Sequence, residues 1–251
     1  MSRITRPLRV GIIGTGGIAG QHIDGYKKAE GVELVAACDV IESRAIGMKE
    51  KHGFQTHFTS WEEMIKHADL DAVSVCTPPF AHLEPTIGAL EAGLHVLCEK
   101  PMALDSIQAQ KMVDAWHKVR EAKGNLFSVG FQSRYGKNAQ QLKRFIDAGE
   151  LGDVYYVRAA YLRRRGVPAW GVFTSKELNG GGPMIDVGVH VLDLSMWLMG
   201  HPKIQSVYGA SFRKFGNRPN VFNPWGAWDP AKYDVEDSAF AMIRFENGAA
   251  L

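Results

Sequence analysis

The sequence has few cysteines, no long apolar run and almost no net charge, and each shortage argues against a class of protein. Only three of the 251 residues are cysteines, Cys38, Cys76 and Cys98, and they form neither a C-x-x-C pair nor a zinc-ligand spacing. An odd number of scattered thiols suits a reducing compartment, so we expect a cytoplasmic protein rather than a disulfide-stabilised secreted one. All three lie at the ends of apolar runs and are expected to be small buried side chains.

Membrane and nucleic-acid partners are disfavoured as well. The apolar run Leu8–Ile13 enters a glycine turn and is too short for a signal peptide or a membrane-spanning helix. The formal net charge is only +2, and charges of both signs are spread along the chain. The one dense basic run, residues 163–165, is shorter than nucleic-acid-binding clusters and is expected to be a solvated loop. No metal-ligand cluster is found, and the isolated His52, His57 and His201 are expected to be surface or turn residues.

The first half of the chain alternates short apolar runs with amphipathic stretches. Short runs bounded by polar or turn residues predict buried parallel strands, here at Leu8–Ile13, Val32–Cys38, Ala72–Val75, Leu94–Leu97 and Leu126–Val129. Helices are expected between them, at Gly17–Ala29, Glu42–His52, Ser60–His67, Phe80–Ala92 and Asp105–Ala122. This alternation predicts an α/β fold built on a doubly wound parallel sheet.

The second half has a different pattern. One helix is expected over Ala139–Ala148 and another within residues 180–200, after a group of glycines. Alternating segments with aromatic residues predict strands at Val154–Leu162, Lys203–Phe212 and Ser238–Phe245. Because this is an α+β pattern, we place the domain boundary near Gly124, with one domain at 1–124 and a second at 125–251.

The last residues have the pattern of a strand pair that has just begun. Glu246-Asn247-Gly248 predicts a hairpin turn, and residues 249–251 predict the first part of a returning strand. Because a domain rarely stops within such a pair, we expect the native protein to continue beyond Leu251.

A glycine motif follows the first expected strand directly. Gly14, Gly16 and Ala19 form the pattern G-x-G-x-x-A. The first glycine permits a tight turn, the second lets the backbone approach a pyrophosphate, and the alanine permits close helix–strand packing. The phosphates would lie at the helix N-terminus, beside Gly17 and Ile18, where unpaired N–H groups point outward. At the opening of the first strand–helix unit, the motif predicts a Rossmann dinucleotide site.

The choice between NAD and NADP depends on Asp39, which ends the second expected strand. An acid about 20 residues beyond the glycine motif can hydrogen-bond the adenosine ribose hydroxyls. A carboxylate there repels a 2′-phosphate, and Val40 and Ile41 supply no cation, so NAD is favoured. Arg44, one helical turn onward, leaves NADP possible if its side chain turns toward a phosphate. Its alternative is a solvated helix residue.

Four further segments resemble the motifs of one family. C-E-K-P at 98–101, at the carboxyl end of a strand, resembles its E-K-P motif, and G-G-G-P-M-I-D-V-G-V-H at 180–190 resembles its D-x-x-x-H segment. T-P-P at 77–79 with His82 resembles its T-P-[NP]-x-x-H loop, and G-F-Q-S-R-Y at 130–135 resembles the segment that closes its nucleotide domain. With the glycine motif, these segments make the chain similar to the glucose–fructose oxidoreductase / inositol dehydrogenase (Gfo/Idh/MocA) family.

The resemblance implies an NAD(P)-dependent oxidoreductase that moves a hydride between nicotinamide and a secondary hydroxyl or ketone of a sugar, cyclitol or related polyol. It implies a second domain with a large, open, mainly antiparallel sheet that joins subunits, hence a homodimer or homotetramer. Members run ~100 residues longer, within ordinary domain sizes, so this sheet is expected to be incomplete here. The resemblance also implies cofactor contacts at Thr77, Pro78, His82, Glu99, Lys100 and Gln132, with Gln132 near the nicotinamide carboxamide.

Three residues are candidates for the chemistry. Lys100 follows a strand at the edge where open α/β sheets bind ligands, and could hydrogen-bond the reacting oxygen. Asp186 and His190 are four residues apart on an expected helix, so they share one face. Histidine is the natural general base near neutral pH, and Asp186 could orient it or bind a substrate hydroxyl. Asp193 continues this face and is expected to be structural.

Substrate recognition and the type of activity stay open in part. Tyr161, Arg163 and Trp170 are candidate substrate contacts, because sugars present apolar faces and hydroxyl edges. Packing or solvent exposure is the alternative for each. Besides a dehydrogenase, an NAD-dependent glycosidase with transient ring oxidation and a catalytically silent nucleotide-binding sensor are possible functions.

Overall fold

The computed structural model describes residues 6–251, so the first five residues of the expected 1–124 domain lie outside the described part. The chain divides into two compact units, the first ending at Gly130 and the second running from Phe131 to Leu251. The division falls a short way beyond Gly124 because the strand β6 (Phe127–Val129) pairs with β5 (His95–Cys98) and so belongs to the first unit.

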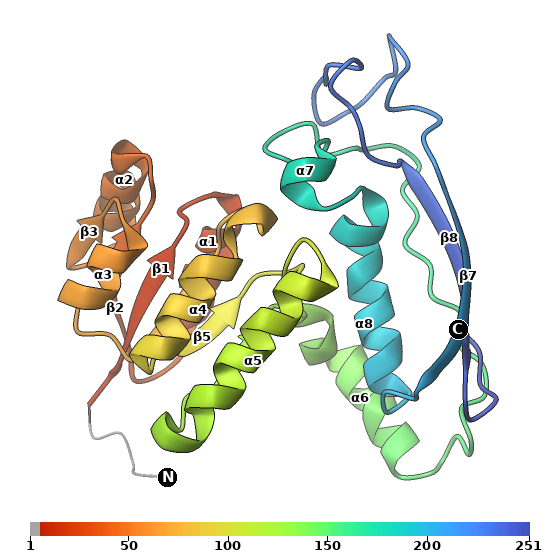
Figure 1. The fold of residues 1–251 in the computed structure, drawn as a ribbon, viewed down its shortest axis with the longest axis horizontal. Coiled ribbons are helices and arrows are strands. Elements are labelled where there is room, and N and C mark those ends of the chain that lie inside the picture. Colours follow the sequence, from red (N-terminus) through yellow and green to blue (C-terminus); the bar gives the residue numbers. More distant parts are fainter. Residues whose placement is uncertain (1–5) are drawn as a thin grey trace. The chain divides into compact units, whose positions relative to one another are not determined.

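The first unit is built on a parallel six-stranded sheet in the order β3-β2-β1-β4-β5-β6 (Figure 1). Its other strands are β1 (Leu8–Ile13), β2 (Val32–Cys38), β3 (Thr56–Phe58) and β4 (Ala72–Val75). Its helices are α1 (Gly17–Lys28), α2 (Glu42–His52), α3 (Trp61–His67), the 3-10 turn η1 (Pro79–Ala81), α4 (Leu83–Ala92) and α5 (Ser106–Lys123). The strand order reverses direction at β1 and β4, which defines a doubly wound sheet and confirms the expected fold class.

Most expected elements of this unit are present within one or two residues, and the local chemistry explains their ends. Ser60 and Asp105 cap α3 and α5 by accepting backbone hydrogen bonds at 3.2 and 2.8 Å. The strand β3 was not expected, because three residues are too few to show a period. The expected helix over 80–92 is divided at His82 into η1 and α4.

The core of the first unit lies on both faces of the sheet. Ile12 packs with Ala19 and Ile23 of α1 on one face, while Ile13 and Met64 belong to the larger cluster on the other. This division follows from the alternation of side chains along β1.

All three cysteines are buried, as expected. Burial raises the pKa of Cys38 and of Cys98 to about 12, so these thiols stay neutral near pH 7. Burial likewise raises the pKa of Cys76 well above its ordinary value. The cysteines therefore serve as small apolar side chains in the core.

The second unit combines helices with a two-stranded antiparallel sheet, which confirms its α+β character. It contains the 3-10 turn η2 (Gln132–Tyr135), α6 (Lys137–Asp147), α7 (Lys176–Asn179), a π-helical turn η3 (Met184–Gly188), α8 (Val189–Leu198), β7 (Ile204–Phe212) and β8 (Ser238–Phe245). Ile243 and Phe245 of β8 pack against Leu192 and Met196 of α8. This contact forms the core of the unit.

The expected hairpin after β8 is present. Gly248 has a φ of 86°, and the backbones of Ile243 and Leu251 exchange hydrogen bonds of 2.8 and 2.9 Å. The returning segment therefore pairs with β8.

The expected strand over Val154–Leu162 is wrong. Among the described residues it forms only one isolated bridge, between Tyr156 and Ala250. Side-chain alternation also occurs in an exposed extended chain, and a strand additionally needs a ladder partner along its length.

Within residues 6–251, no helix has both the length and the apolar composition needed to cross a bilayer.

Candidate functional site

Four of the expected site residues follow the carboxyl ends of neighbouring strands in the first unit. Asp39 follows β2, Gly14 follows β1, Thr77 comes two residues after β4 ends, and Lys100 comes two residues after β5 ends. Because these strands are parallel and adjacent, the four residues lie in this order along one edge of the sheet. We call it the carboxyl edge; it is where open α/β sheets bind their ligands.

The glycine turn at the middle of this edge requires Gly14. Its φ is 87°, and a Cβ atom there would lie 2.7 Å from the backbone nitrogen of Thr77 and 2.8 Å from the carbonyl carbon of Cys76. Its N–H donates to the carbonyl of Cys38 at 2.8 Å, so the turn is tied to β2. No side chain other than hydrogen fits this position.

The N-terminus of α1 fits a pyrophosphate. Gly16 is the N-cap residue of α1. Among the described residues, no side chain caps this end of the helix, and the first turn contains no acidic residue. Gly16 and Gly17 are exposed, and a Cβ atom at either would meet no described atom within 4 Å. Ile18 follows in the same turn, and Ala19 is fully buried against the sheet, as the motif predicts. The exposed N–H groups and the positive end of the helix dipole favour an anion here.

The carboxylate of Asp39 is held by the glycine turn itself. One oxygen accepts hydrogen bonds from the backbone N–H and the hydroxyl of Thr15, each at 2.9 Å, and the other accepts from the N–H of Ile41 at 2.9 Å. Thr15 is the x of the G-x-G pattern, and its role was not expected from the sequence. Its backbone N–H and hydroxyl together fix the orientation of the Asp39 carboxylate.

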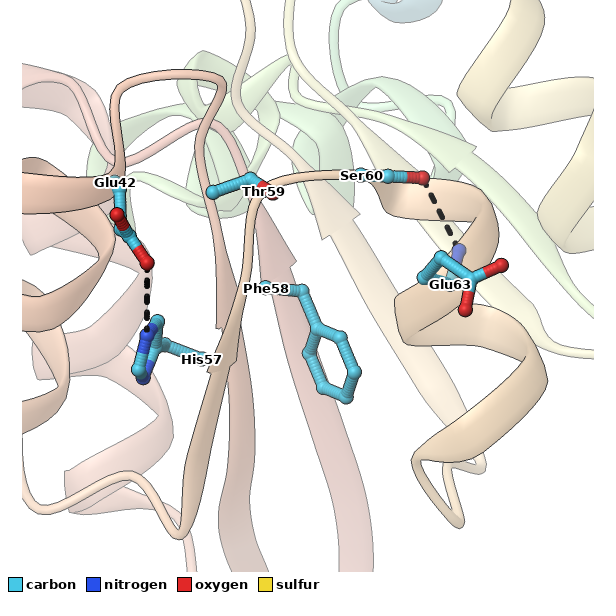
Figure 2. Close-up of a pocket in the computed structure, with 6 residues that line it drawn as sticks. All are labelled: Glu42, His57, Phe58, Thr59, Ser60 and Glu63. Atoms are coloured by element: carbon cyan, nitrogen blue, oxygen red, sulfur yellow. Dashed lines mark hydrogen bonds and ion pairs between the residues drawn. The ribbon is translucent and has the colours of Figure 1, made fainter.

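A shallow pocket adjoins Asp39, whose N–H donates to the carbonyl of Phe58 at 3.2 Å. Figure 2 shows the residues that line it: Glu42, His57, Phe58, Thr59, Ser60 and Glu63. His57 lies in β3 and its ring nitrogen is 3.9 Å from the carboxylate of Glu42, so it is not the isolated turn residue that we expected. Two carboxylates line the pocket, and Arg44 is exposed on the first turn of α2.

His82 connects two loops of the carboxyl edge. The side chain is 1% exposed, and its two ring nitrogens lie 2.8 Å from the carbonyl oxygens of Thr77 and Pro101. Burial lowers its pKa, while these carbonyls act in the opposite direction. Thr77 also donates its hydroxyl to the carbonyl of Ala81 at 2.8 Å, and Pro78 is exposed. The imidazole therefore holds the T-P-P loop against the loop that follows Lys100.

Glu99 and Lys100 lie where β5 leaves the sheet. Lys100 is half-buried, its N–H donates to a carboxylate oxygen of Glu99 at 3.0 Å, and its peptide bond to Pro101 is cis. Glu99 is 8% exposed and its other oxygen lies 2.8 Å from Nε2 of His22. Burial tends to raise the pKa of Glu99, but the hydrogen bond from His22, together with the backbone N–H and the charge of Lys100, outweighs burial and holds this pKa below its ordinary value.

His22 was not identified from the sequence. Ala19, His22, Ile23 and Tyr26 have the spacing of one helix face, and two of them are fully buried. A polar residue on a buried helix face needs a polar partner. That rule was the available signal, but it could not name Glu99, 77 residues away.

In the second unit, the backbone of the glycine motif at residues 180–182 lies very close to the backbone of Glu236. A Cβ atom at Gly182 would lie 1.9 Å from the carbonyl oxygen of Glu236, so only glycine fits. Asn179 is buried and donates to the carbonyl of Gly181 at 2.7 Å. Gly180, with a φ of 86°, ends α7. This turn sets the start of the helix that carries Asp186 and His190.

Asp186 and His190 lie four residues apart on one helical segment, but the part that holds Asp186 is π-helical rather than α-helical as expected. Asp186 lies in the π-helical turn Met184–Gly188, and His190 is the second residue of α8. A π-turn holds more residues than an α-turn, so the α-helical spacing rule does not apply across it. Such turns occur frequently at functional sites, and no sequence period marks them.

Asp193 is structural, as expected. Its side chain is 8% exposed and forms a two-pronged ion pair with Arg134, with one hydrogen bond of 2.7 Å from Nε and a second from the neighbouring nitrogen. This pair fastens η2 to α8. Gln132, in the same 3-10 turn, is exposed.

The three candidate substrate contacts gather around a residue that we did not expect, Trp225. The guanidinium of Arg163 lies 5.2 Å from the ring centre of Tyr161 and 4.9 Å from that of Trp225. The ring of Trp170 is 5.9 Å from Trp225. We call these four residues the aromatic cluster. Its three aromatic side chains are 43–54% exposed, so a ligand can reach them.

The aromatic cluster is built from two loops, one with Gly166 and Val167 and the other with Asn223 and Trp225. Hydrogen bonds between these loops hold the cluster together. The side chain of Asn223 accepts from the N–H of Val167 at 3.0 Å and donates to its carbonyl at 2.8 Å. Gly166 has a φ of 108°, and a Cβ atom there would lie 3.1 Å from the ring of Trp225. The exposed basic run at residues 163–165 is therefore partly stacked on aromatic rings rather than wholly solvated.

No group of three or more His, Cys, Asp or Glu residues within 6–251 is arranged to hold a metal ion.

Comparison with known proteins matches both units. The model of an oxidoreductase family with an NAD-binding Rossmann fold matches residues 8–131, and that of the GFO/IDH/MocA C-terminal domain matches residues 139–251. The chain belongs to this family. The resemblance read from the motifs, the oxidoreductase class and NAD as the family's cofactor are thereby confirmed.

Individual relatives cover most of this chain. D-glucoside 3-dehydrogenase of Escherichia coli is 44% identical over 246 residues, which are 98% of this chain and 69% of that protein. Myo-inositol 2-dehydrogenase of Thermotoga maritima is 30% identical, over 96% of this chain and 66% of that protein. A solved levoglucosan dehydrogenase, in complex with NADH and levoglucosan, matches with a TM-score of 0.82 at 27% identity, over 98% of this chain and 65% of that one. The chain thus spans 65–69% of the length of these relatives.

Proposed function

We propose that this protein is an NAD-dependent dehydrogenase that oxidises a secondary hydroxyl of a glucoside or a related sugar or cyclitol to the ketone. The observation that carries the proposal is the carboxyl edge, where Asp39, Gly14, Thr77 and Lys100 follow one another beside the exposed N-terminus of α1. This order suits the adenosine, the pyrophosphate and the nicotinamide of one dinucleotide in turn.

The cofactor contacts follow from this order. The N–H groups of Gly16, Gly17 and Ile18 would receive the pyrophosphate, and Asp39 would accept from the ribose hydroxyls. Thr77 and Pro78 would border the dinucleotide, and Gln132 would bind the nicotinamide carboxamide. His82 and Glu99, which are buried, would act by holding these loops rather than by direct contact.

In the reaction, NAD supplies the hydride acceptor. The hydroxyl proton needs a base, and His190 takes it, because imidazole is the side chain best suited to accept a proton near neutral pH. The Lys100 ammonium donates a hydrogen bond to the same oxygen and stabilises its developing negative charge. Asp186 orients His190 or binds a neighbouring hydroxyl. The products are the ketone, NADH and one proton.

The substrate proposal rests on similarity and on the aromatic cluster. The E. coli relative, at 44% identity, is named for D-glucosides and position 3. Exposed aromatic rings bind the apolar face of a pyranose, and the edge of a stacked guanidinium donates to its hydroxyls. We therefore propose that oxidation occurs at carbon 3 of a D-glucoside, with the aromatic cluster in contact with the substrate.

The direct test is a panel of methyl and aryl D-glucosides, free glucose and myo-inositol, each with NAD or NADP, followed by NADH absorbance and by analysis of the products. A 3-keto-glucoside formed together with NADH supports the proposal. Cleavage of the glycosidic bond without net NADH supports a glycosidase instead, and NAD binding without turnover of any compound supports a sensor. The names of the relatives favour the dehydrogenase.

Asp39 controls the choice of cofactor in this proposal. We expect Asp39→Ala to weaken NAD binding and to relax discrimination against NADP, because the variant removes the acceptor for the ribose hydroxyls and the charge that repels a 2′-phosphate. Titrations of wild type and variant with both reduced cofactors measure this. Tenfold tighter binding of NADP than NAD by the wild type, about 1.4 kcal/mol, would contradict the assignment and point to Arg44.

Trp225 should influence substrate binding but not chemistry. We expect Trp225→Ala to raise KM for the glucoside roughly three- to tenfold, with kcat little changed, since a lost aromatic contact typically costs about 0.5–1.5 kcal/mol. Phe215→Ala, which removes an exposed aromatic ring of the same unit outside the aromatic cluster, is the matched control. An unchanged KM for every substrate would exclude the aromatic cluster from the substrate site.

We also propose a cytoplasmic homodimer or homotetramer joined through the sheet of the second unit. Ile243 and Phe245 of β8 face α8, while Tyr208, Phe240 and Met242 are 63–80% exposed. An exposed apolar sheet face of this kind favours association. Sedimentation of the full-length protein tests this, and a stable monomer at micromolar concentration would refute it.

A further inference from the structure

A chain of four polar side chains crosses the interior of the first unit, and the reaction as derived so far does not use three of them. The hydroxyls of Tyr26 and Ser74 are 2.6 Å apart, Nδ1 of His22 lies 3.1 Å from Ser74, and Nε2 lies 2.8 Å from Glu99. We call this the His22 chain. Ser74 is fully buried, and the side chains of His22 and Glu99 are 9% and 10% exposed.

One donor order satisfies every member of the chain. Tyr26 donates to Ser74, Ser74 donates to Nδ1 of His22, and Nε2–H of His22 donates to Glu99. The remaining oxygen of Glu99 accepts the backbone N–H of Lys100 at 3.0 Å. Both oxygens of the Glu99 carboxylate therefore accept a hydrogen bond, one from Nε2–H of His22 and the other from the backbone N–H of Lys100.

The His22 chain joins the two parts of the site that must be aligned. His22 lies in α1, the helix whose N-terminus fits the pyrophosphate, and Glu99 directly precedes Lys100. The link spans 77 residues of sequence and runs through the interior, so it does not depend on surface loops. Rigid support of this kind is what keeps a reacting side chain in a productive geometry.

We propose that His22 is a positioning residue: through Glu99, it fixes the backbone of Lys100 relative to the cofactor-binding helix. This inference rests on the proposed function, because it presumes that Lys100 acts on the substrate.

The physical reason is the cost of a buried carboxylate without partners. If His22 loses its donor, Glu99 must take up a proton or rotate toward water, because an unpaired buried charge is strongly unfavourable. Either change weakens or breaks the bond from the Lys100 N–H and moves the peptide between Glu99 and Lys100. The pyrophosphate contacts at Gly16 and Gly17 are not part of this chain and remain intact. Turnover should therefore fall while cofactor affinity stays.

The variants grade the chain member by member. His22→Leu removes both hydrogen bonds, His22→Gln restores a donor for Glu99 and an acceptor for Ser74, and Tyr26→Phe removes only the outer hydroxyl. We expect kcat to fall about 10- to 100-fold in His22→Leu, as for a small misplacement of a reacting group. His22→Gln should recover most of this loss, and Tyr26→Phe should change kcat least.

The matched control is another histidine–glutamate pair, at the surface of α3. His67 lies 3.0 Å from Glu63, and these side chains are 53% and 57% exposed. His67→Leu should leave kcat, KM and the melting temperature unchanged. NADH affinity, measured by fluorescence titration, should stay within about twofold of wild type in every variant. The reason is that the pyrophosphate contacts at Gly16 and Gly17 are not part of the His22 chain.

The deciding experiment is a double-mutant cycle with Lys100→Met. If His22 acts through Lys100, His22→Leu lowers kcat in the wild type but has no further effect on the residual kcat of Lys100→Met. If His22→Leu does not fold, as judged by circular dichroism, Glu99→Gln takes its place, because it keeps the shape and removes the charge. An equal loss in both backgrounds, or a loss of NADH affinity matching the loss of kcat, would overturn the inference. Normal turnover in Lys100→Met would instead refute the proposed function.

Discussion

Replacing Lys100 or His190 by alanine should lower kcat by roughly 10²–10⁴-fold, the usual cost of losing a positioned acid or base. NADH affinity should remain nearly intact, because neither side chain is assigned to the pyrophosphate or the adenosine. Steady-state kinetics with the best glucoside, together with fluorescence titration of NADH, separate the two effects. The pH profile of kcat/KM should also have a limb that the His190 variant lacks.

The controls for this prediction are two exposed residues of one helix, α5. Lys111→Ala and His117→Ala, both exposed on α5, should leave turnover and binding unchanged. Asp186→Asn should reduce kcat less than His190→Ala if it only orients the imidazole, and should raise KM if it binds a hydroxyl. Near-normal turnover in His190→Ala would break the assignment, and Tyr161 would become the next candidate base.

Two glycines of the same motif should respond to alanine in opposite ways. Gly14→Ala should destabilise the protein by more than about 2 kcal/mol, because the residue has a positive φ and its Cβ would meet the backbone of Cys76 and Thr77. For a chain of this length, the melting temperature should fall by at least roughly 4 °C. Thermal unfolding followed by circular dichroism measures this.

Gly16→Ala is the matched comparison. A Cβ atom there meets no described atom within 4 Å. The melting temperature should therefore stay within about 1 °C of the wild-type value, as is expected of a surface substitution. NADH affinity should nevertheless fall about tenfold or more, about 1.4 kcal/mol, because the backbone can no longer approach the pyrophosphate. Unchanged NADH affinity would show that the phosphates do not lie at this turn.

Parts of the candidate site could be predicted because they depend on a few adjacent residues. Gly14 and Ala19 each have a steric reason to be small, and the strand ends before Asp39 and Lys100 follow from short apolar runs. The family membership, in turn, was carried by E-K-P and the D-x-x-x-H segment.

Other parts depend on contacts between distant residues, which no local period contains. The clearest errors are the strand over Val154–Leu162, which has the alternation of a strand without a ladder partner, and the α-helical geometry of Asp186 and His190. In both cases the side-chain pattern was compatible with more than one backbone conformation, and packing decided between them.

The sequence by itself therefore determined the doubly wound sheet, the dinucleotide turn and the oxidoreductase family, because each is written in residues close together along the chain. Only the tertiary structure decided that His22 supports Glu99 across 77 residues and that Trp225 completes the aromatic cluster with Arg163. The physical reason is that a buried polar group or a half-exposed ring is satisfied by whatever the fold brings next to it. That neighbour is set by the packing of whole elements rather than by the local sequence.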